Sequence, residues 1–204
     1  MSSPARADII FYFHAPGAIN ASDNLLFNAD GLALEGLTVQ GITQSGTLLD
    51  ITGNELLTAG GGQATVGAQD GAFTWLWFEP NSLGVLFELF EANLAVYHTT
   101  GPPPTGTVTV NVVNNFGVTE SGAFQVGPGN NNFSMKALDP QLMRSIEISS
   151  TIPLEYIRQI RLDGIQTPTS TPPGDVPEAG TLLLFGMGLL VVSRQLRRGV
   201  TRTV

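Results

Sequence analysis

The chain of 204 residues contains no cysteine, only two histidines and few charged side chains, which make up 13% of the total. The lack of cysteine excludes a small scaffold held together by disulfides. The histidines, His14 and His98, are far apart in the sequence and belong to no metal-ligand pattern. A zinc site needs more nitrogen or sulfur ligands than these, so we expect no catalytic metal.

Basic residues are scarce outside the C-terminal tail. Residues 1–178 hold all 17 acidic residues but only five of the nine Lys and Arg residues, and the other four, all arginines, follow them. An acidic main part disfavours nucleic acid or anionic lipid as a partner. It is compatible with neutral glycans, with cations or with solubility alone.

Long amphipathic helical patterns are also missing, and short alternating segments take their place. In Thr107–Val112 the valines Val108, Val110 and Val112 alternate with polar residues, which is typical of a half-buried strand. Turn residues such as Gly and Asn separate the segments. We predict strands at Ile9–His14, Ala33–Gln40, Thr47–Thr52, Gln63–Val66, Ala72–Phe78, Val85–Glu91, Leu94–Thr99, Thr107–Val113, Val118–Val126, Ser145–Thr151 and Ile157–Leu162.

Eleven short strands without intervening long helices predict an all-β fold, an antiparallel β-sandwich over residues 8–165. A jelly-roll is the version we favour. One short helix is predicted at Asp139–Met143, with Asp139 as its N-cap and Pro140 at its first position. The Gly127–Asn132 segment is interpreted as a long surface connection.

The C-terminal 30 residues have a distinct composition. A linker rich in Pro, Thr and Ser, residues 166–175, precedes a short motif, an uncharged apolar run and a basic cluster. The motif is Val176, Pro177, Glu178, Ala179 and Gly180. The apolar run is Thr181, Leu182, Leu183, Leu184, Phe185, Gly186, Met187, Gly188, Leu189, Leu190, Val191 and Val192. The basic residues that follow are Arg194, Arg197 and Arg198.

As a helix, the apolar run would cover roughly 18 Å, against about 30 Å of bilayer hydrocarbon. It is therefore a marginal transmembrane helix, with the arginines on the cytoplasmic side and residues 1–178 outside. The alternative is a C-terminal helix buried in the core of the domain.

On these residues, the C-terminal segment, residues 176–204, resembles the PEP-CTERM sorting signals of bacterial surface proteins. The family usually has a third proline where this chain has Ala179. The resemblance implies processing by an exosortase near Pro177–Gly180, a Gram-negative-type envelope, transient residence in the inner membrane, and association with exopolysaccharide or biofilm matrix.

The N-terminal residues 1–7 fit an exported protein. Ala5 and Ala7 form an Ala-x-Ala pattern, which is the cleavage-site part of a signal peptide. We expect the reading frame to begin further upstream, with residues 1–7 as the remnant of a cleavage region. The alternative is a plain disordered start that contains Ala-Arg-Ala by chance.

The aromatic segment Phe73–Phe78 is the strongest binding candidate. In a regular strand Phe73, Trp75 and Trp77 share one face. If that face is open, the tryptophans could stack on sugar rings. The other interpretation is a central strand that is buried on both faces.

Chemistry beyond binding has weaker support. Glu79, Glu88 and Glu91 on adjacent predicted strands could form the carboxylate pair of a glycoside hydrolase, although solvent-facing strand acids are the simpler interpretation. Calcium could bind loop oxygen atoms, but the spacing matches no EF-hand. The candidate calcium ligands are Asp23, Asn24, Asn28, Asp30 and Asp70.

Taken together, the sequence predicts an exported, non-catalytic protein of the cell surface or extracellular matrix, with a binding or structural role in exopolysaccharide. A secreted glycan-active enzyme is the alternative. A purely structural or adhesive matrix protein is the third hypothesis.

Overall fold

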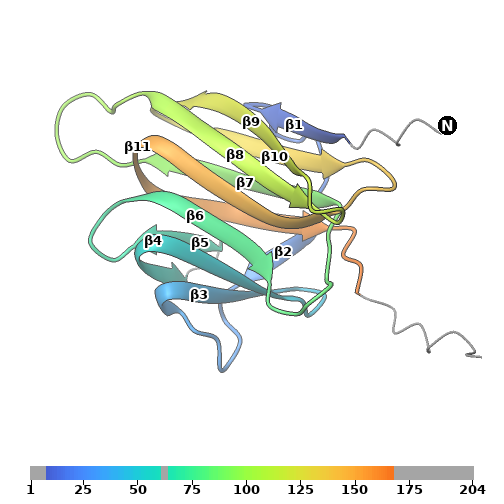
Figure 1. Cartoon of the computed structure of the whole chain (residues 1–204). Coiled ribbons are helices and arrows are strands. Elements are labelled where there is room, and N and C mark those ends of the chain that lie inside the picture. The colour runs from blue at the N-terminus through green and yellow to red at the C-terminus, as the bar shows by residue number, and fades with distance from the viewer. Residues whose placement is uncertain (1–7, 61–63, 168–204) are drawn as a thin grey trace, which may run out of the picture. The chain divides into compact units, whose positions relative to one another are not determined.

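The computed structural model describes residues 8–60 and 64–167, which form eleven β-strands and no helix. All of the strand pairs in this part of the chain are antiparallel (Figure 1). The all-β antiparallel prediction is therefore confirmed. The strands are β1 (Ile9–Phe13), β2 (Asp23–Leu26), β3 (Glu35–Thr43), β4 (Leu48–Gly60), β5 (Thr65–Ala68), β6 (Phe73–Pro80), β7 (Leu89–Val96), β8 (Gly106–Asn114), β9 (Thr119–Val126), β10 (Asn131–Ala137) and β11 (Met143–Asp163).

The strands form two layers that share their longest member. In the first layer β9, β8, the first half of β11, β6, β4 and β3 lie side by side. In the second layer β1, β10, β7 and the second half of β11 follow one another, and β5 and β2 also pair with β11. Figure 1 shows β11 passing from one layer to the other. The arrangement is sandwich-like, and the jelly-roll version of the prediction is not confirmed.

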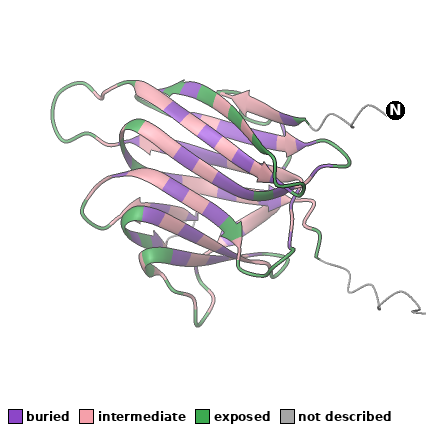
Figure 2. Ribbon diagram, in the orientation of Figure 1, coloured by how far each residue is buried: buried purple, intermediate pink, exposed green. Residues whose placement is uncertain are grey.

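Alternation along the strands builds the core between the layers. Val108, Val110 and Val112 of β8 are fully buried, as the sequence pattern predicts, and so are Ile146 and Ile148 of β11. Figure 2 shows buried and partly exposed residues alternating along β6, β8 and β11. Every side chain of this kind that leaves water stabilises the fold by about 1.5–3 kcal/mol.

A chain of phenylalanine rings crosses the core from one layer to the other. The ring centroids of Phe78 in β6 and Phe90 in β7 are 5.5 Å apart, and those of Phe90 and Phe133 in β10 are 6.0 Å apart. Phe133 then contacts Phe124 in β9, and Phe124 stacks on Phe13 in β1. Because these rings come from five strands, they fix the two layers against each other.

The free edges of the two layers, β1 and β9, meet without a backbone ladder. The backbone N–H of Ile9 donates to Glu120 Oε2 at 2.8 Å, and His14 Nε2 lies 2.7 Å from the carbonyl oxygen of Gln125. Gly122 lies beneath the rings of Phe11 and Phe13, where an added Cβ would come within 2.8 Å of either ring. Aromatic side chains therefore close the edge at which backbone pairing is missing.

Several predicted elements differ from those observed. In two places, two predicted strands are one strand in the structure. The predicted strands Val85–Glu91 and Leu94–Thr99 correspond to β7, and the predicted strands Ser145–Thr151 and Ile157–Leu162 correspond to β11. Strands β2 and β10 were missed, and Gly127–Asn132, which was interpreted as a surface connection, runs into β10. The Gly127–Asn132 segment was misassigned because its polar residues are typical of surface loops. The buried side chain of Asn131 donates to the carbonyl oxygens of Leu94 and Gly127, so it is part of the sheet and not of a solvated loop.

The short helix predicted at Asp139–Met143 is wrong. Asp139 and Pro140 form a turn with a cis peptide bond between them, and Met143 is already the first residue of β11. The N–H of Gln141 donates to the carbonyl oxygen of Leu138, and the Asn115 side chain bonds to the backbone of Pro140 and Leu142. These partners satisfy the backbone groups of the turn, which joins β10 directly to β11.

Other predictions fall on residues outside the described ranges. These are the cleavage candidates Ala5 and Ala7, the linker beyond Thr167, the motif Val176–Gly180, the apolar run Thr181–Val192 with its predicted helix, and the arginines Arg194, Arg197 and Arg198. Within residues 8–60 and 64–167 there is no helix that could cross a membrane.

Candidate functional site

Trp75 and Trp77 lie on the outer side of the first layer. Both side chains are partly exposed, whereas Leu76 and Phe78 between and beside them are fully buried. The strand is central, since β6 lies between β4 and β11, but only its inner face is buried. The structure therefore leaves both indole rings within reach of solvent.

Phe73 does not share this face, contrary to the alternation of the sequence. It is 1% exposed and lies opposite Leu154, because the register between β6 and β11 shifts between Ser149 and Leu154. At the same point Asn54 of β4 accepts hydrogen bonds from the N–H groups of Thr74 and Trp75 through its side-chain oxygen. The start of β6 thus turns inward, and the outward pair is reduced to Trp75 and Trp77.

A row of polar side chains flanks Trp77 across the layer. Trp77 lies opposite Thr52 of β4 on one side and Glu147 of β11 on the other. Beyond Thr52 comes Thr38 of β3, and the two hydroxyl oxygens are 2.9 Å apart. Beyond Glu147 come Asn111 and Ser121, which are hydrogen-bonded to each other at 2.7 Å.

Within this row the side chains are positioned by one another. Asn111 Nδ2 donates to Glu147 Oε1 at 3.5 Å, which is long for a hydrogen bond, while Ser121 donates to Asn111. Trp75 has a similar polar neighbour, Ser149, and beyond it Thr109. We call the surface formed by Trp75, Trp77 and this row the tryptophan face. It offers apolar rings beside hydroxyl, amide and carboxylate groups, and its row contains one carboxylate and no basic residue.

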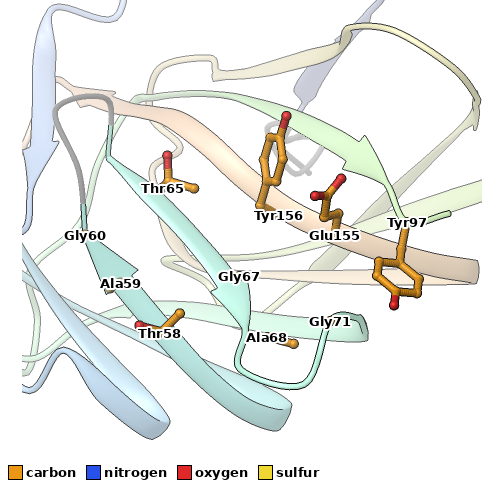
Figure 3. Close-up of a pocket in the computed structure, with 10 residues that line it drawn as sticks. All are labelled: Thr58, Ala59, Gly60, Thr65, Gly67, Ala68, Gly71, Tyr97, Glu155 and Tyr156. Carbon is orange, nitrogen blue, oxygen red and sulfur yellow. The ribbon is translucent and has the colours of Figure 1, made fainter. Parts of the chain in front are cut away.

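A second feature lies on the outer side of the other layer. A hollow of about 440 Å³ is bounded by the last residues of β4, which pair with β5 and not with β6, and by β5, the residue after β7 and the second half of β11. Figure 3 shows Glu155 and Tyr156 projecting from β11, with Tyr97 beside them. We call this hollow the tyrosine groove. It is lined by Thr58, Ala59, Gly60, Thr65, Gly67, Ala68, Gly71, Tyr97, Glu155 and Tyr156.

Glycine and alanine make room for the groove. Gly67 of β5 pairs with Tyr156, and a Cβ on Gly67 would lie 3.1 Å from the carbonyl oxygen of Glu155. Gly71 has a φ of 117°, and a Cβ there would lie 2.9 Å from the hydroxyl oxygen of Tyr97. The missing Cβ atoms thus let β11 pack closely on β5 and let the Tyr97 ring pack on the turn at Gly71, and the other lining residues of β4 and β5 are small: Thr58, Ala59, Gly60, Thr65 and Ala68.

The far side of Tyr156 is supported by Arg158. The guanidinium carbon of Arg158 lies 5.4 Å from the centre of the Tyr156 ring, and its Nη2 donates to Asn130 Oδ1 at 3.0 Å. A second hollow of about 310 Å³ begins here and includes His98, Asn130 and Arg158. Glu155 and Tyr156 line both hollows, so the two adjoin.

The three glutamates proposed for hydrolysis do not lie on neighbouring strands. β6, which carries Glu79, pairs with β4 and β11, whereas β7, which carries Glu91, pairs with β10 and β11. Glu88, just before β7, pairs with Lys136 at 3.5 Å. The prediction of adjacent strands was wrong because the 81–88 connection crosses from the first layer to the second.

The residues suggested for calcium come from three places in the fold: β2, the connection from β2 to β3, which holds Asn28 and Asp30, and the turn before β6. Asp23 and Asn24 are strand residues of β2, where Asp23 accepts hydrogen bonds from Ser45 and Asn24 accepts one from Arg161. Asp70 lies in the turn between β5 and β6. In the described ranges, no group of three or more His, Asp or Glu side chains is placed to hold a metal ion.

One carboxylate has a perturbed pKa. Hydrogen bonds from the Ser22 hydroxyl, from the Gly164 N–H and from the Ser22 N–H lower the pKa of Asp163 below its ordinary value, and burial opposes them in part. Asp163 ends β11 and ties the loop before β2 to it. This is a structural contact and lies apart from both surfaces described above.

The class of protein follows first from the fold, which is a two-layer antiparallel β domain. Comparison with known families then identifies its destination, because the PEP-CTERM protein-sorting motif matches residues 175–198. The chain thus carries a sorting signal of the kind processed by exosortases, which supports an exported protein directed to the cell surface. The resemblance predicted from the motif, apolar run and arginines is confirmed. No curated protein and no solved structure matches the chain.

Sequence reasoning singled out Trp75 and Trp77 as candidates and left their exposure open, and it missed the polar row and the tyrosine groove. Part of the polar row could have been predicted from the sequence, because Thr109 and Asn111 alternate with valines that were expected to be buried. The groove was not, because Tyr97 and Tyr156 are brought together only by the pairing of β7 with β11.

Proposed function

We propose that this protein is a non-catalytic, exopolysaccharide-binding protein of the cell surface or extracellular matrix, and that it binds uncharged sugar chains through the tryptophan face. The carrying observation is the outward exposure of Trp75 and Trp77 beside a hydrogen-bonded polar row. Partly exposed indole rings give flat apolar contact with a sugar ring, and the row offers donors and acceptors to its hydroxyl groups.

Charge supports an uncharged ligand. The acidic residues outnumber the basic ones along residues 1–178, and Glu147 stands beside Trp77. An anionic polymer would be repelled by this face. The sorting signal supports the location, since processing by an exosortase would leave the β domain among surface polysaccharides.

The test is affinity electrophoresis of the full chain in gels containing dextran, hydroxyethylcellulose or galactomannan. We expect the native protein to be retarded by at least one of them, and Trp75→Ala with Trp77→Ala to weaken that binding about tenfold or more. Phe116→Ala is the matched control, because this ring is 61% exposed at the β8–β9 turn, away from β6.

Melting temperature separates binding from folding. A variant that melts like the native protein but binds more weakly supports the proposal. Unchanged binding by a folded variant contradicts it. Release of reducing ends from any of the polymers would support the glycan-active enzyme, and self-association without retardation would support a purely structural matrix protein.

Processing can be followed independently. The mass of the protein recovered from the cell surface should correspond to a chain that ends near Pro177–Gly180. A surface form that retains Arg198 would contradict exosortase processing of this chain.

A further inference from the structure

We propose that the tyrosine groove is a second saccharide-binding site, so that the domain is bivalent and cross-links polysaccharide chains. This inference rests on the proposed function for the class of ligand. It does not require that the tryptophan face be the stronger site.

The groove has the chemical groups that a sugar chain requires. Tyr97 and Tyr156 supply rings with an apolar face and a hydroxyl at the edge. The Glu155 carboxylate between them is exposed and accepts hydrogen bonds only, so it suits a ligand rich in hydroxyl donors. An anionic ligand is disfavoured, because the lining of the groove contains the Glu155 carboxylate and no basic residue.

The shape also fits an extended ligand. The two hollows of about 440 and 310 Å³ lie on either side of the shared residues Glu155 and Tyr156, so an extended chain can contact both. Each is within the size range of small-ligand sites, at about 300–1,000 Å³. At Gly60, which also lines the first hollow, an added Cβ would meet no atom within 4 Å, so the backbone there is open to a ligand.

The rings are positioned before any ligand arrives. Arg158 supports Tyr156, and the Tyr97 ring packs on Gly71, while the Tyr97 N–H donates to the carbonyl oxygen of Pro153 in β11. Rings that are already ordered lose little freedom on binding.

Bivalency follows from the places of the two surfaces. The tryptophan face is carried by the ladder of β4, β6, β11 and β8, and the groove by the second half of β11 with β5 and the end of β7. Since each lies on the outer side of a different layer, one domain can hold two chains at once.

The test compares three full-length variants in the same polysaccharide gels and in light scattering of the mixed solutions. They are Trp75→Ala with Trp77→Ala, Tyr97→Ala with Tyr156→Ala, and the combination of all four. Tyr12→Ala is the control, because Tyr12 is a partly exposed tyrosine of β1 in the second layer and lines neither hollow. Glu155→Gln, at an exposed position, tests the groove without removing a ring.

We expect each double variant to remain retarded but to lose the rise in scattering that the native protein causes, and the combined variant to lose both. Glu155→Gln should weaken retardation in the tryptophan double variant. If the tyrosine double variant cross-links as well as the native protein, or the tryptophan double variant is not retarded at all, the groove is not a site, and the proposed function stands. If only the tyrosine variant loses retardation, the groove stands and the tryptophan face is wrong. A native protein that none of the three polymers retards overturns both.

Discussion

The outer surfaces of the two layers differ in how their side chains are held. On the tryptophan face, regular pairing from β3 to β9 places Thr52, Trp77, Glu147 and Asn111 side by side, so the surface is a straight row. At the tyrosine groove, β11 shifts register between Leu154 and Tyr156, and β5 is only four residues long. Regular ladders thus give a flat platform, and a bent strand beside glycine-rich partners gives a hollow.

The bend in β11 lies between the tryptophan face and the tyrosine groove. Truncating the buried Leu154 side chain at this bend should have the largest effect on stability. Leu154 is fully buried and lies opposite Phe73 of one layer and Val96 of the other. Leu154→Ala should lower the free energy of unfolding by about 2–5 kcal/mol, because it leaves a cavity where the layers meet. Urea denaturation measures this.

The control for Leu154 is Leu83→Ala, which removes the same atoms from a side chain that is 91% exposed. It should change stability by no more than about 0.5 kcal/mol. Equal losses of unfolding free energy in both variants would show that the packing of Leu154 at the bend does not stabilise the fold.

Gly71→Ala should act on the groove alone, with an intermediate effect. Gly71 has a φ of 117°, where an alanine is strained, and its Cβ would press on the Tyr97 ring. We expect a loss of about 1–3 kcal/mol in stability and a displaced Tyr97, detected by the NMR signals of its ring. Gly46→Ala, at a φ of 96° with open space around its Cβ, carries the backbone strain without the contact. The same ring shift in both variants would contradict the packing of Tyr97 on Gly71.

Asn54→Ala should disturb the tryptophan face alone, by about 1 kcal/mol. The Asn54 side chain holds the N–H groups of Thr74 and Trp75 at the point where β4 departs from the β6 ladder. Without it we expect the fluorescence of Trp75 to shift while the tyrosine groove keeps its structure. An unchanged emission spectrum would mean that the inward turn of β6 is set by other contacts.

The sequence predicted a strand correctly where apolar and polar residues alternate regularly, and less well where turn-forming residues lie inside a strand. Val108, Val110 and Val112 gave the correct strand and the correct inner face, because burial on one side of a regular strand imposes alternation. The predicted strand Thr47–Thr52 stops before Gly53 and Asn54, which are residues that favour turns. The observed strand β4 continues through them to Gly60, because such residues also form bulges within strands.

Long-range contacts explain the rest of the difference. The inward position of Phe73 follows from the register of β6 against β11, whose paired residues are far apart in the sequence. Asn93 lies between the predicted strands Val85–Glu91 and Leu94–Thr99, but it is buried within β7 and donates to the side chain of Asn132 in β10. The sorting signal, in contrast, is read from contiguous residues, so its identification needed no fold.

The smallest expected effect concerns Asp163 at the end of β11. A change there should alter neither the tryptophan face nor the tyrosine groove. The Ser22 hydroxyl and the backbone N–H groups of Gly164 and Ser22 lower the pKa of Asp163, so the ionised carboxylate stabilises the folded state. A lowered pKa contributes stability that is present above the unfolded value, about 3.9, and is lost as the pH falls through the folded value. Ser22→Ala should therefore be less stable than the native protein at pH 7, and the difference should shrink below about pH 4. Urea unfolding at pH 7, 5 and 3 measures this, with Asp163→Asn as the control that lacks the titrating group. A difference that stays constant across the three pH values would mean that Ser22 acts through packing and not through the charge of Asp163.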